Sequence, residues 1–215
     1  NGELISRTNY KNGERDGLRE DFYKNSQLWV RGNYKLGISH GLNEVFYENG
    51  QLKGTRNYKN GIYDGLNELF YENGQLESRE NYKDGKLNGL REEFYENGQL
   101  KEKLNYKDGE QNGLFEWYFD DGKLSMKSNY KEGKPDGLSE NFYENGQIFY
   151  RRNFKNGEWD GLYEEYYKNG QLEIRGNYKH GKEDGLWESF DKDSSILLNY
   201  CYKESEVTNM SYCED

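Results

Sequence analysis

The sequence is poor in the side chains on which most globular domains and enzymes depend. Only 32% of its 215 residues are hydrophobic, and it contains two histidines and two cysteines. It has no G-x-x-x-x-G-K-(S/T) phosphate-binding loop and no G-x-S-x-G nucleophile elbow, and two histidines leave a nucleophile without a nearby base. We therefore expect a non-enzymatic protein with no catalytic residue and no cofactor.

Long hydrophobic runs and an excess of positive charge are also missing. No stretch approaches the roughly 18 apolar residues of a membrane-spanning helix, and no signal peptide is found. Forty acidic residues against 30 basic ones give a net charge of −10. Nucleic acids and anionic lipids are bound by summed Lys and Arg charge. We therefore expect no nucleic-acid partner, and the composition disfavours a membrane lipid.

Aromatic residues and glycine are abundant instead. Phe, Trp and Tyr make up 16% of the chain, with 21 tyrosines, and there are 26 glycines. A chain of low hydrophobicity and high net charge would ordinarily be disordered, but disordered chains are poor in aromatic residues. The aromatic content therefore indicates an ordered structure that uses these rings.

A 24-residue repeat accounts for this composition. The dipeptide Asn-Tyr, replaced once by Asn-Phe, recurs every 24 residues in a unit that reads G-L-x-E-x-F-Y-E-N-G-Q-L-x-x-(K/R)-x-N-Y-K-N-G-x-x-(D/N). Residues 1–16 form a half repeat, and residues 204–215 form a non-repeat tail or cap. The eight units begin at Gly17, Gly41, Gly65, Gly89, Gly113, Gly137, Gly161 and Gly185, and the last loses the pattern after Lys203. Such self-similarity decides the architecture before any secondary structure is assigned.

Each unit reads as a β-hairpin. Two short runs rich in aromatic and branched residues flank an Asn-Gly pair such as Asn73-Gly74, which favours a two-residue type I′ turn. A second turn, of the kind spanning 59–65, leads into the next hairpin. The sequence therefore predicts an all-β fold, an elongated single-sheet antiparallel meander of tandem hairpins.

A two-residue turn at Asn73-Gly74 would also fix which residues face each other. It places Tyr71 opposite Leu76 and Glu68 opposite Arg79. The column of Glu68 is Glu in all eight units, and the opposite column is basic in six of eight. Opposite charges across a ladder stabilise a sheet by about 0.2–1 kcal/mol per pair, so we interpret these columns as structural and not catalytic. The predicted ladder comprises Glu20, Glu68, Arg79, Glu92, Lys103, Glu140, Arg151, Glu164 and Arg175.

The same turn places Gly65 opposite Tyr82. A ring lying over a facing glycine can restore the packing that a strand loses at glycine. We therefore predict that these glycines and tyrosines hold the sheet together.

The repeat resembles a known family. The run Asn-Tyr-Lys-Asn-Gly-x-x-Asp-Gly, with His40-Gly41 in the last place of one unit, and the following F-Y-E-N-G-Q-L resemble the bacterial variant form of the MORN repeat, over residues 1 to about 203. The resemblance implies a sheet of successive hairpins and a role in scaffolding or partner binding, and some bacterial members are grouped with YwqK-type antitoxins. Eukaryotic MORN repeats are linked to membranes and, in some plant proteins, accompany a lipid-kinase domain, of which this sequence has no segment.

Metal sites are not expected. The connecting turns resemble calcium loops, but the Asp position is His40, Asn88 or Asn112 in other units, and turn chemistry explains the pattern. No His or Cys cluster has the spacing of a zinc site. Cys201 and Cys213 are compatible with one disulfide in an exported protein or with two thiols in a cytosolic one.

Departures from the repeat are the best indication of a binding surface, since invariant columns build the array. On the face shared with Tyr82, the variable columns are polar or small in the N-terminal half and become aromatic in the C-terminal half. Because aromatic residues dominate binding hot spots, we predict a protein-binding surface there. Alternatively, large residues merely fill this face, or the tail covers it. The predicted binding residues are Phe115, Trp117, Tyr150, Trp159, Tyr163 and Trp187.

The expected partner is another protein or a second copy of the chain. One hypothesis is a scaffold that is exported or surface-associated. The alternative is a cytoplasmic inhibitor of a toxin, whose acidic surface meets a basic effector, and a lipid-binding module is a weaker third. Asn1-Gly2-Glu3-Leu4 matches the middle of the repeat, so we expect the natural N-terminus to lie upstream, and the compartment stays open.

Overall fold

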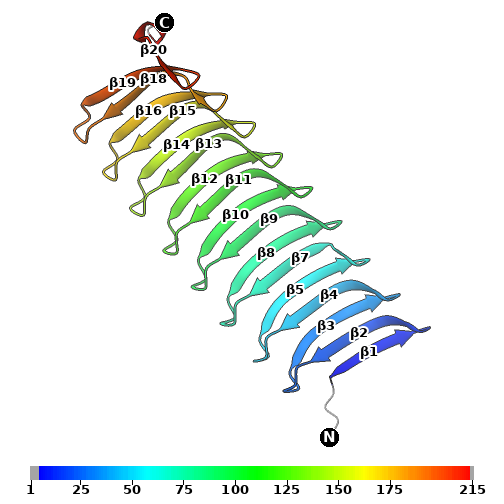
Figure 1. Cartoon of the computed structure of the whole chain (residues 1–215). Coiled ribbons are helices and arrows are strands. Elements are labelled where there is room, and N and C mark those ends of the chain that lie inside the picture. Colours follow the sequence, from blue (N-terminus) through cyan, green and yellow to red (C-terminus); the bar gives the residue numbers. More distant parts are fainter. Residues whose placement is uncertain (1–4, 214–215) are drawn as a thin grey trace. The chain divides into compact units, whose positions relative to one another are not determined.

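Runs of aromatic and branched residues alternate with Gly-containing turns along the chain, and the structure folds them as antiparallel strands. This computed structural model describes residues 5–213, so Asn1-Gly2-Glu3-Leu4 lies outside the described residues. The chain divides into unit 1, residues 1–110, and unit 2, residues 111–215. Within each unit the strands lie side by side in sequence order with turns at both edges (Figure 1). The prediction of an all-β meander of tandem hairpins is confirmed.

The strands are short and regular. Those of unit 1 are β1 (Ser6–Lys11), β2 (Glu14–Phe22), β3 (Leu28–Lys35), β4 (Ile38–Phe46), β5 (Leu52–Lys59), β6 (Ile62–Tyr63), β7 (Gly65–Phe70), β8 (Leu76–Lys83), β9 (Lys86–Phe94) and β10 (Leu100–Lys107). Those that follow are β11 (Glu110–Tyr118), β12 (Leu124–Lys131), β13 (Lys134–Phe142), β14 (Ile148–Lys155), β15 (Glu158–Tyr166), β16 (Leu172–Lys179), β17 (Lys182–Glu183), β18 (Gly185–Phe190), β19 (Ile196–Lys203) and β20 (Glu206–Thr208), before a 3₁₀ turn, η1 (Met210–Cys213).

The prediction of a two-residue type I′ turn at Asn73-Gly74 is wrong. At Asn73-Gly74 only the glycine has positive φ, +83°, and the Tyr71 N–H donates to the Gln75 carbonyl at 2.9 Å, which closes a three-residue loop. The type I′ turns lie at the other edge, where Asp84 (φ +49°) and Gly85 (φ +81°) join β8 to β9. Both loops use Asn-Gly-like pairs, so the dipeptide alone does not distinguish them.

The longer loop shifts one of the predicted pairs. Glu68 faces Arg79 and Gly65 faces Tyr82 in the predicted register, but Phe70, not Tyr71, faces Leu76, because a bulge follows Leu69. The prediction for Tyr71 is therefore wrong, since its backbone pairs with the loop. Gly65 also adopts a backbone conformation that favours glycine. Its φ is +112°, and an added Cβ would meet the side chain of Asn57 at 3.2 Å.

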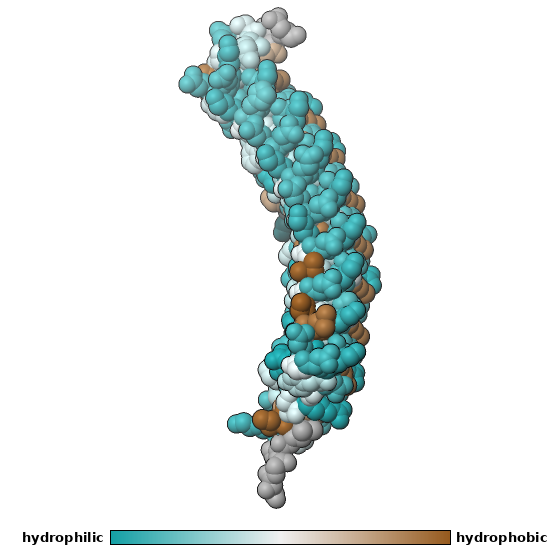
Figure 2. Space-filling model, turned by 90° about the vertical axis from the view of Figure 1, so that its right-hand side faces the viewer, coloured by the Kyte–Doolittle hydropathy of each residue, from teal (hydrophilic) through white to brown (hydrophobic). Residues whose placement is uncertain are grey.

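Both edges join one hairpin to the next. On the edge of the three-residue loops, the Tyr71 hydroxyl donates to the carbonyl of Phe94 in the following hairpin at 2.7 Å. On the type I′ edge, the Gly85 N–H donates to the carbonyl of Tyr63 at 2.8 Å. Seen from the type I′ edge, the surface is mainly hydrophilic with scattered hydrophobic patches (Figure 2).

The meander has almost no apolar core. Among the described residues, the buried hydrophobic side chains are those of Leu104 and Cys201 alone, whereas the buried polar ones include Glu20, Glu92 and Ser139. Backbone ladders and polar or aromatic side-chain contacts therefore hold the hairpins together.

The predicted tail adds one more strand. β20 pairs with β19, and Cys213 in η1 forms a disulfide with Cys201. The hydroxyl of Tyr212 donates to the Asp184 carboxylate at 3.1 Å. Within residues 5–213, no helix is long and apolar enough to cross a membrane.

Candidate functional site

Alternation along the strands gives the sheet two distinct faces. One carries Glu68 and Arg79 with their equivalents in other repeats, and we name it the ladder face. The other carries Asn67, Glu80 and Tyr82 with their equivalents, and we name it the ring face.

The charged columns of the ladder face lie together, but their ion pairs connect neighbouring hairpins. Arg79 faces both Glu68 and Glu92, and its guanidinium pairs with Glu92 of the following hairpin. The guanidinium also lies 6.0 Å from the ring centroid of Phe94. The prediction of pairing within one hairpin is therefore corrected. The other pairs are Arg7–Glu20, Arg31–Glu44, Lys127–Glu140, Arg151–Glu164 and Arg175–Glu188.

Four carboxylates of the ladder face are buried and already paired with basic side chains. Glu20, Glu92, Glu140 and Glu164 are all less than 10% exposed, and each accepts an ion pair. Lys103 faces Glu92 in the β9–β10 register. Because cross-strand charge pairs stabilise a sheet, this arrangement supports a structural role for the ladder.

All six predicted binding residues lie on the ring face of unit 2. Phe115 and Trp117 come from β11, Tyr150 from β14, Trp159 and Tyr163 from β15, and Trp187 from β18.

The structure gathers these residues into two groups. Phe115 lies 6.5 Å from Trp117 and 6.0 Å from Tyr130, between ring centroids. β13, which carries Ser139 and Asn141 on this face, separates this group from the rest.

The second group is a continuous run of rings, which we name the ring run. Tyr163 stacks against Tyr150 at 6.5 Å, Trp159 at 6.5 Å and Trp187 at 5.7 Å, with interplanar angles of 22–28°. Tyr178 stands perpendicular to Trp187 at 5.1 Å, and Tyr202 meets the other side of the run at 6.2 Å. The run therefore comprises Tyr150, Trp159, Tyr163, Tyr178, Trp187 and Tyr202.

A guanidinium is held by the near end of the ring run. The Arg152 guanidinium carbon lies 5.0 Å from the ring centroid of Tyr150, 5.1 Å from that of Phe154 and 4.9 Å from that of Trp159. Its Nε is buried with no hydrogen-bond partner among the described residues. Such distances are typical of cation–π contacts, so this face holds a cation with rings alone.

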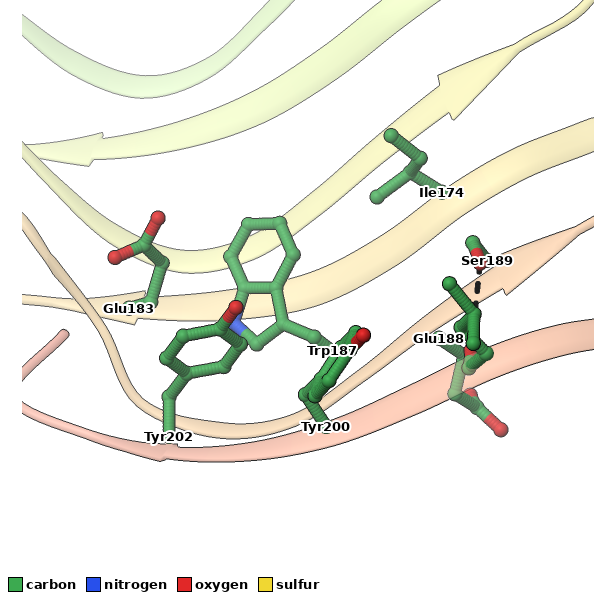
Figure 3. Close-up of a pocket in the computed structure, with 8 residues that line it drawn as sticks. Ile174, Glu183, Trp187, Glu188, Ser189, Tyr200 and Tyr202 are labelled. Carbon is green, nitrogen blue, oxygen red and sulfur yellow. Dashed lines mark hydrogen bonds between the residues drawn. The ribbon is translucent and has the colours of Figure 1, made fainter. Parts of the chain in front are cut away.

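The far end of the ring run forms a pocket. A Cβ at Gly176 would come 2.1 Å from the Trp187 ring, so the indole lies directly over the glycine backbone. The indole N–H donates to the Asn177 carbonyl at 3.2 Å. Figure 3 shows Glu183 and Tyr202 on one side of Trp187, with Ile174 and Ser189 on the other. The pocket, of about 130 Å³, is also lined by Leu198 and Tyr200.

Carboxylates accompany the rings and affect their titration. Burial, followed by a 2.9 Å hydrogen bond to Glu165, raises the pKa of the Tyr163 hydroxyl. Burial, followed by the charge of Glu183, raises the pKa of Tyr178. These hydroxyls are therefore neutral donors at pH 7, and the anionic groups beside them favour a cationic ligand.

The described residues of the tail, 204–213, do not cover this surface. Cys201 faces Leu186 in the ladder-face register, so its disulfide anchors the tail from the opposite side of the sheet. Leu198 and Tyr200, which line the pocket, remain 55% and 44% exposed. The alternative of a ring face closed by the tail is thus wrong.

Sequence reasoning missed three members of this site. Tyr178 and Tyr202 belong to the column that is Tyr in every repeat but one, which the sequence indicates to be structural. Arg152 occupies a column that holds Gly176 and Tyr200 in the next two repeats, and only its ring neighbours, supplied by the fold, reveal its role. Across the described part of the chain, no three His, Cys, Asp or Glu side chains gather as a metal site would require.

Comparisons with known proteins identify the repeat but no close relative. No curated protein matches the chain. Solved structures include TarM, 16% identical over 50% of this chain and 20% of that one, with a TM-score of 0.31. A TarM variant from S. aureus with fondaparinux, α-GlcNAc-glycerol and UDP is 14% identical over 57% and 21%, with a TM-score of 0.25. The chain thus spans about a fifth of the length of these structures.

The family described as "MORN repeat variant" matches more than half of the chain. The matched segments are 15–36, 39–60, 63–84, 87–108, 111–132, 135–156 and 159–180. Each segment spans one hairpin closed by a three-residue loop and ends at the first residue of the following type I′ turn, and on this evidence the chain belongs to the MORN repeat variant family.

Proposed function

We propose that this protein is a non-enzymatic binding scaffold that holds a basic, extended segment of a partner protein on the ring face of unit 2. The observation that supports this is the ring run, a row of partly exposed Tyr and Trp side chains that ends in the pocket beside Trp187. Tyr and Trp are enriched among the few residues that dominate binding energy in protein interfaces, because they bury large areas and keep a polar group.

The carboxylates of Glu165 and Glu183 favour a partner with Lys or Arg side chains. Glu183 lines the pocket together with the Trp187 and Tyr202 rings, and a cation over such rings is attracted by their π faces. Arg152 already occupies a comparable ring cluster within the same unit. A net charge of −10 also favours encounter with a basic partner.

Fluorescence titration with synthetic peptides tests this proposal. The probes are extended peptides with Lys at alternate positions and matched peptides with Gln at those positions. We expect the Lys peptides to perturb tryptophan emission and to bind more weakly to Trp187→Leu by about tenfold, the loss of roughly 1.4 kcal/mol. Trp29→Leu in unit 1, where Trp29 is 48% exposed, is the control and keeps full affinity. Equal binding of Lys and Gln peptides, or equal loss in both variants, would contradict the proposal.

The disulfide supports the exported form of this scaffold over a cytoplasmic inhibitor. The Cys201–Cys213 disulfide links η1 to β19. Disulfides form and persist in oxidising compartments. Alkylation of the protein from its native host, followed by mass measurement, distinguishes the two. Two alkylated cysteines in non-reduced protein would favour the cytoplasmic alternative.

A further inference from the structure

The last full strand, β19, differs from the corresponding strand of every other repeat. Residues 194–202 carry no charge, whereas the equivalent nine residues of each earlier repeat carry at least one. Ile196, Leu197, Leu198 and Tyr200 are 57%, 58%, 55% and 44% exposed. Strand edges are ordinarily protected by charged side chains, and a long apolar edge without them is a pairing site.

The outer edge of β19 is only partly occupied. β20 pairs with Cys201, Tyr202 and Lys203 and ends there, since η1 and the disulfide direct the following residues elsewhere. In residues 5–213, no strand lies against the outer side of β19 between Ile196 and Tyr200.

The free backbone groups on this edge can be assigned. Glu204 and Ser205 both have positive φ, 51° and 69°, so Lys203 and Glu206 flank a two-residue turn and form a hydrogen-bonded pair. Hydrogen-bonded positions alternate in an antiparallel ladder. The N–H and C=O groups of Leu197 and Asn199 therefore point outward. Consistent with this, the Leu198 carbonyl points inward and accepts from the Ser189 hydroxyl at 3.4 Å.

We infer that two copies of this chain associate through antiparallel pairing of β19 with β19. Placing Leu197 opposite Asn199 of the second copy satisfies all four outward groups on each strand. Leu198 then faces Leu198 of the second copy, and Ile196 faces its Tyr200. These are apolar pairs of the kind that stabilise sheets.

A second copy fits this edge better than another repeat or the β1 edge. Within the array, a basic residue such as Arg175 pairs with the Glu of the next hairpin, but the equivalent position in β19 is Asn199. β1 would bring Arg7 and Lys11 to the contact, where self-pairing brings no charge at all. The association is independent of the proposed peptide binding.

Self-pairing would also place the ring faces of the two copies next to each other on one side of a continuous sheet. The two-fold axis of an edge-to-edge pair runs perpendicular to the sheet, so the ring faces of both copies of unit 2 lie on the same side. Leu198 and Tyr200 line the pocket beside Trp187, and they would then lie opposite Leu198 and Ile196 of the second copy. The dimer would present two adjacent pockets on one surface.

Sedimentation velocity over a concentration series, with charge exchange at Leu198, tests the inference. We expect a monomer–dimer equilibrium, because four backbone bonds and a few side chains make a small interface. Leu198→Lys and Leu198→Glu should each weaken dimerisation by about tenfold or more, since like charges would face each other. An equimolar mixture of the two variants should dimerise again. Leu66→Lys, at an exposed leucine within unit 1, is the control and should dimerise like the wild type.

Leu197→Pro provides a second variant, because proline is tolerated where a strand N–H points away from the sheet. It should be folded by circular dichroism and monomeric. A wild type that is monomeric throughout, dimers unaffected by Leu198→Lys, a mixture that fails to associate, or assemblies that grow beyond the dimer would each overturn the inference.

Discussion

The ring faces of the two units bury a guanidinium in opposite ways. In unit 1, Arg91 is surrounded by carboxylates: its Nε lies 2.9 Å from Glu80, and its other nitrogens pair with Glu93 and Glu102. In unit 2, Arg152 is surrounded by the rings of Tyr150, Phe154 and Trp159. The same repeat backbone can therefore hold a guanidinium either among carboxylates or among aromatic rings.

The surfaces around Arg91 and Arg152 differ as a result. In unit 1, the carboxylates of Glu80, Glu93 and Glu102 each form an ion pair with Arg91, so these polar groups already have a partner. The rings of unit 2 leave aromatic surface partly exposed to water. The carboxylates of Glu165 and Glu183 lie beside it. The comparison suggests that a repeat array acquires a binding surface by changing variable columns, while the ladder face stays the same.

Replacing each of the two arginines should give the largest difference in stability between the two units. Arg91→Met leaves three carboxylates together without a cation, and we expect it to destabilise the protein by about 2–3 kcal/mol at pH 7, the scale of hydrogen bonds to charged groups. Arg152→Met leaves no unpaired charge and should lower stability by only about 0.5–2 kcal/mol, the range of cation–π contacts. Urea unfolding followed by circular dichroism measures both.

The pH dependence separates the two variants further. Burial raises the pKa of the Glu102 carboxyl, and the charge of Arg91 opposes that rise, so Arg91→Met should raise the folded-state pKa of Glu102 further. A raised folded pKa contributes stability at low pH that is lost as the pH rises through it. The deficit of Arg91→Met should therefore shrink near pH 4, whereas that of Arg152→Met should stay constant. Equal pH profiles would show that carboxylates and rings do not stabilise the two guanidiniums differently.

Two glycines in the same repeat column, one in each unit, allow the packing of the two ring faces to be compared. A Cβ at Gly176 would come 2.1 Å from the rigid Trp187 ring, and a Cβ at Gly32 would come 2.7 Å from the flexible amide of Asn43. We expect Gly176→Ala to cost about 1–3 kcal/mol, as overpacking does, and to displace the indole, which tryptophan fluorescence would report. Gly32→Ala should cost less because the amide can rotate away. A larger loss for Gly32→Ala would mean that the Trp187 ring moves freely.

Columns and register were predictable from the sequence because the repeat samples each position eight times. Glu68 opposite Arg79 followed from that alignment, and the structure has this register. The loop at Asn73-Gly74 was not predictable, since both two- and three-residue loops accept Asn-Gly. The partner of Arg79 was ambiguous as well, because a meander places a Glu on each side of it.

The site was predictable only in part. Trp187 stands out as a departure from the repeat, but its position over Gly176 depends on neighbouring strands. Tyr178 could not be distinguished from the other members of its column, because its contacts with Trp159 and Trp187 arise only where those departures lie next to it.

Tyrosine titration gives the smallest expected effect. Burial, followed by a hydrogen bond to Glu80, raises the pKa of Tyr82 to about 12, and Tyr163 in unit 2 is raised in the same way with Glu165. Unfolded tyrosine ionises near pH 10, so these groups favour the folded state below that pH, and their contribution is lost as the pH rises toward the folded pKa. Tyr82→Phe and Tyr163→Phe should each remove one late-titrating phenolate from the absorbance titration and flatten the alkaline loss of stability. If the loss is flattened in Tyr163→Phe alone, the surrounding rings, and not the carboxylate acceptor common to both faces, keep the hydroxyl protonated.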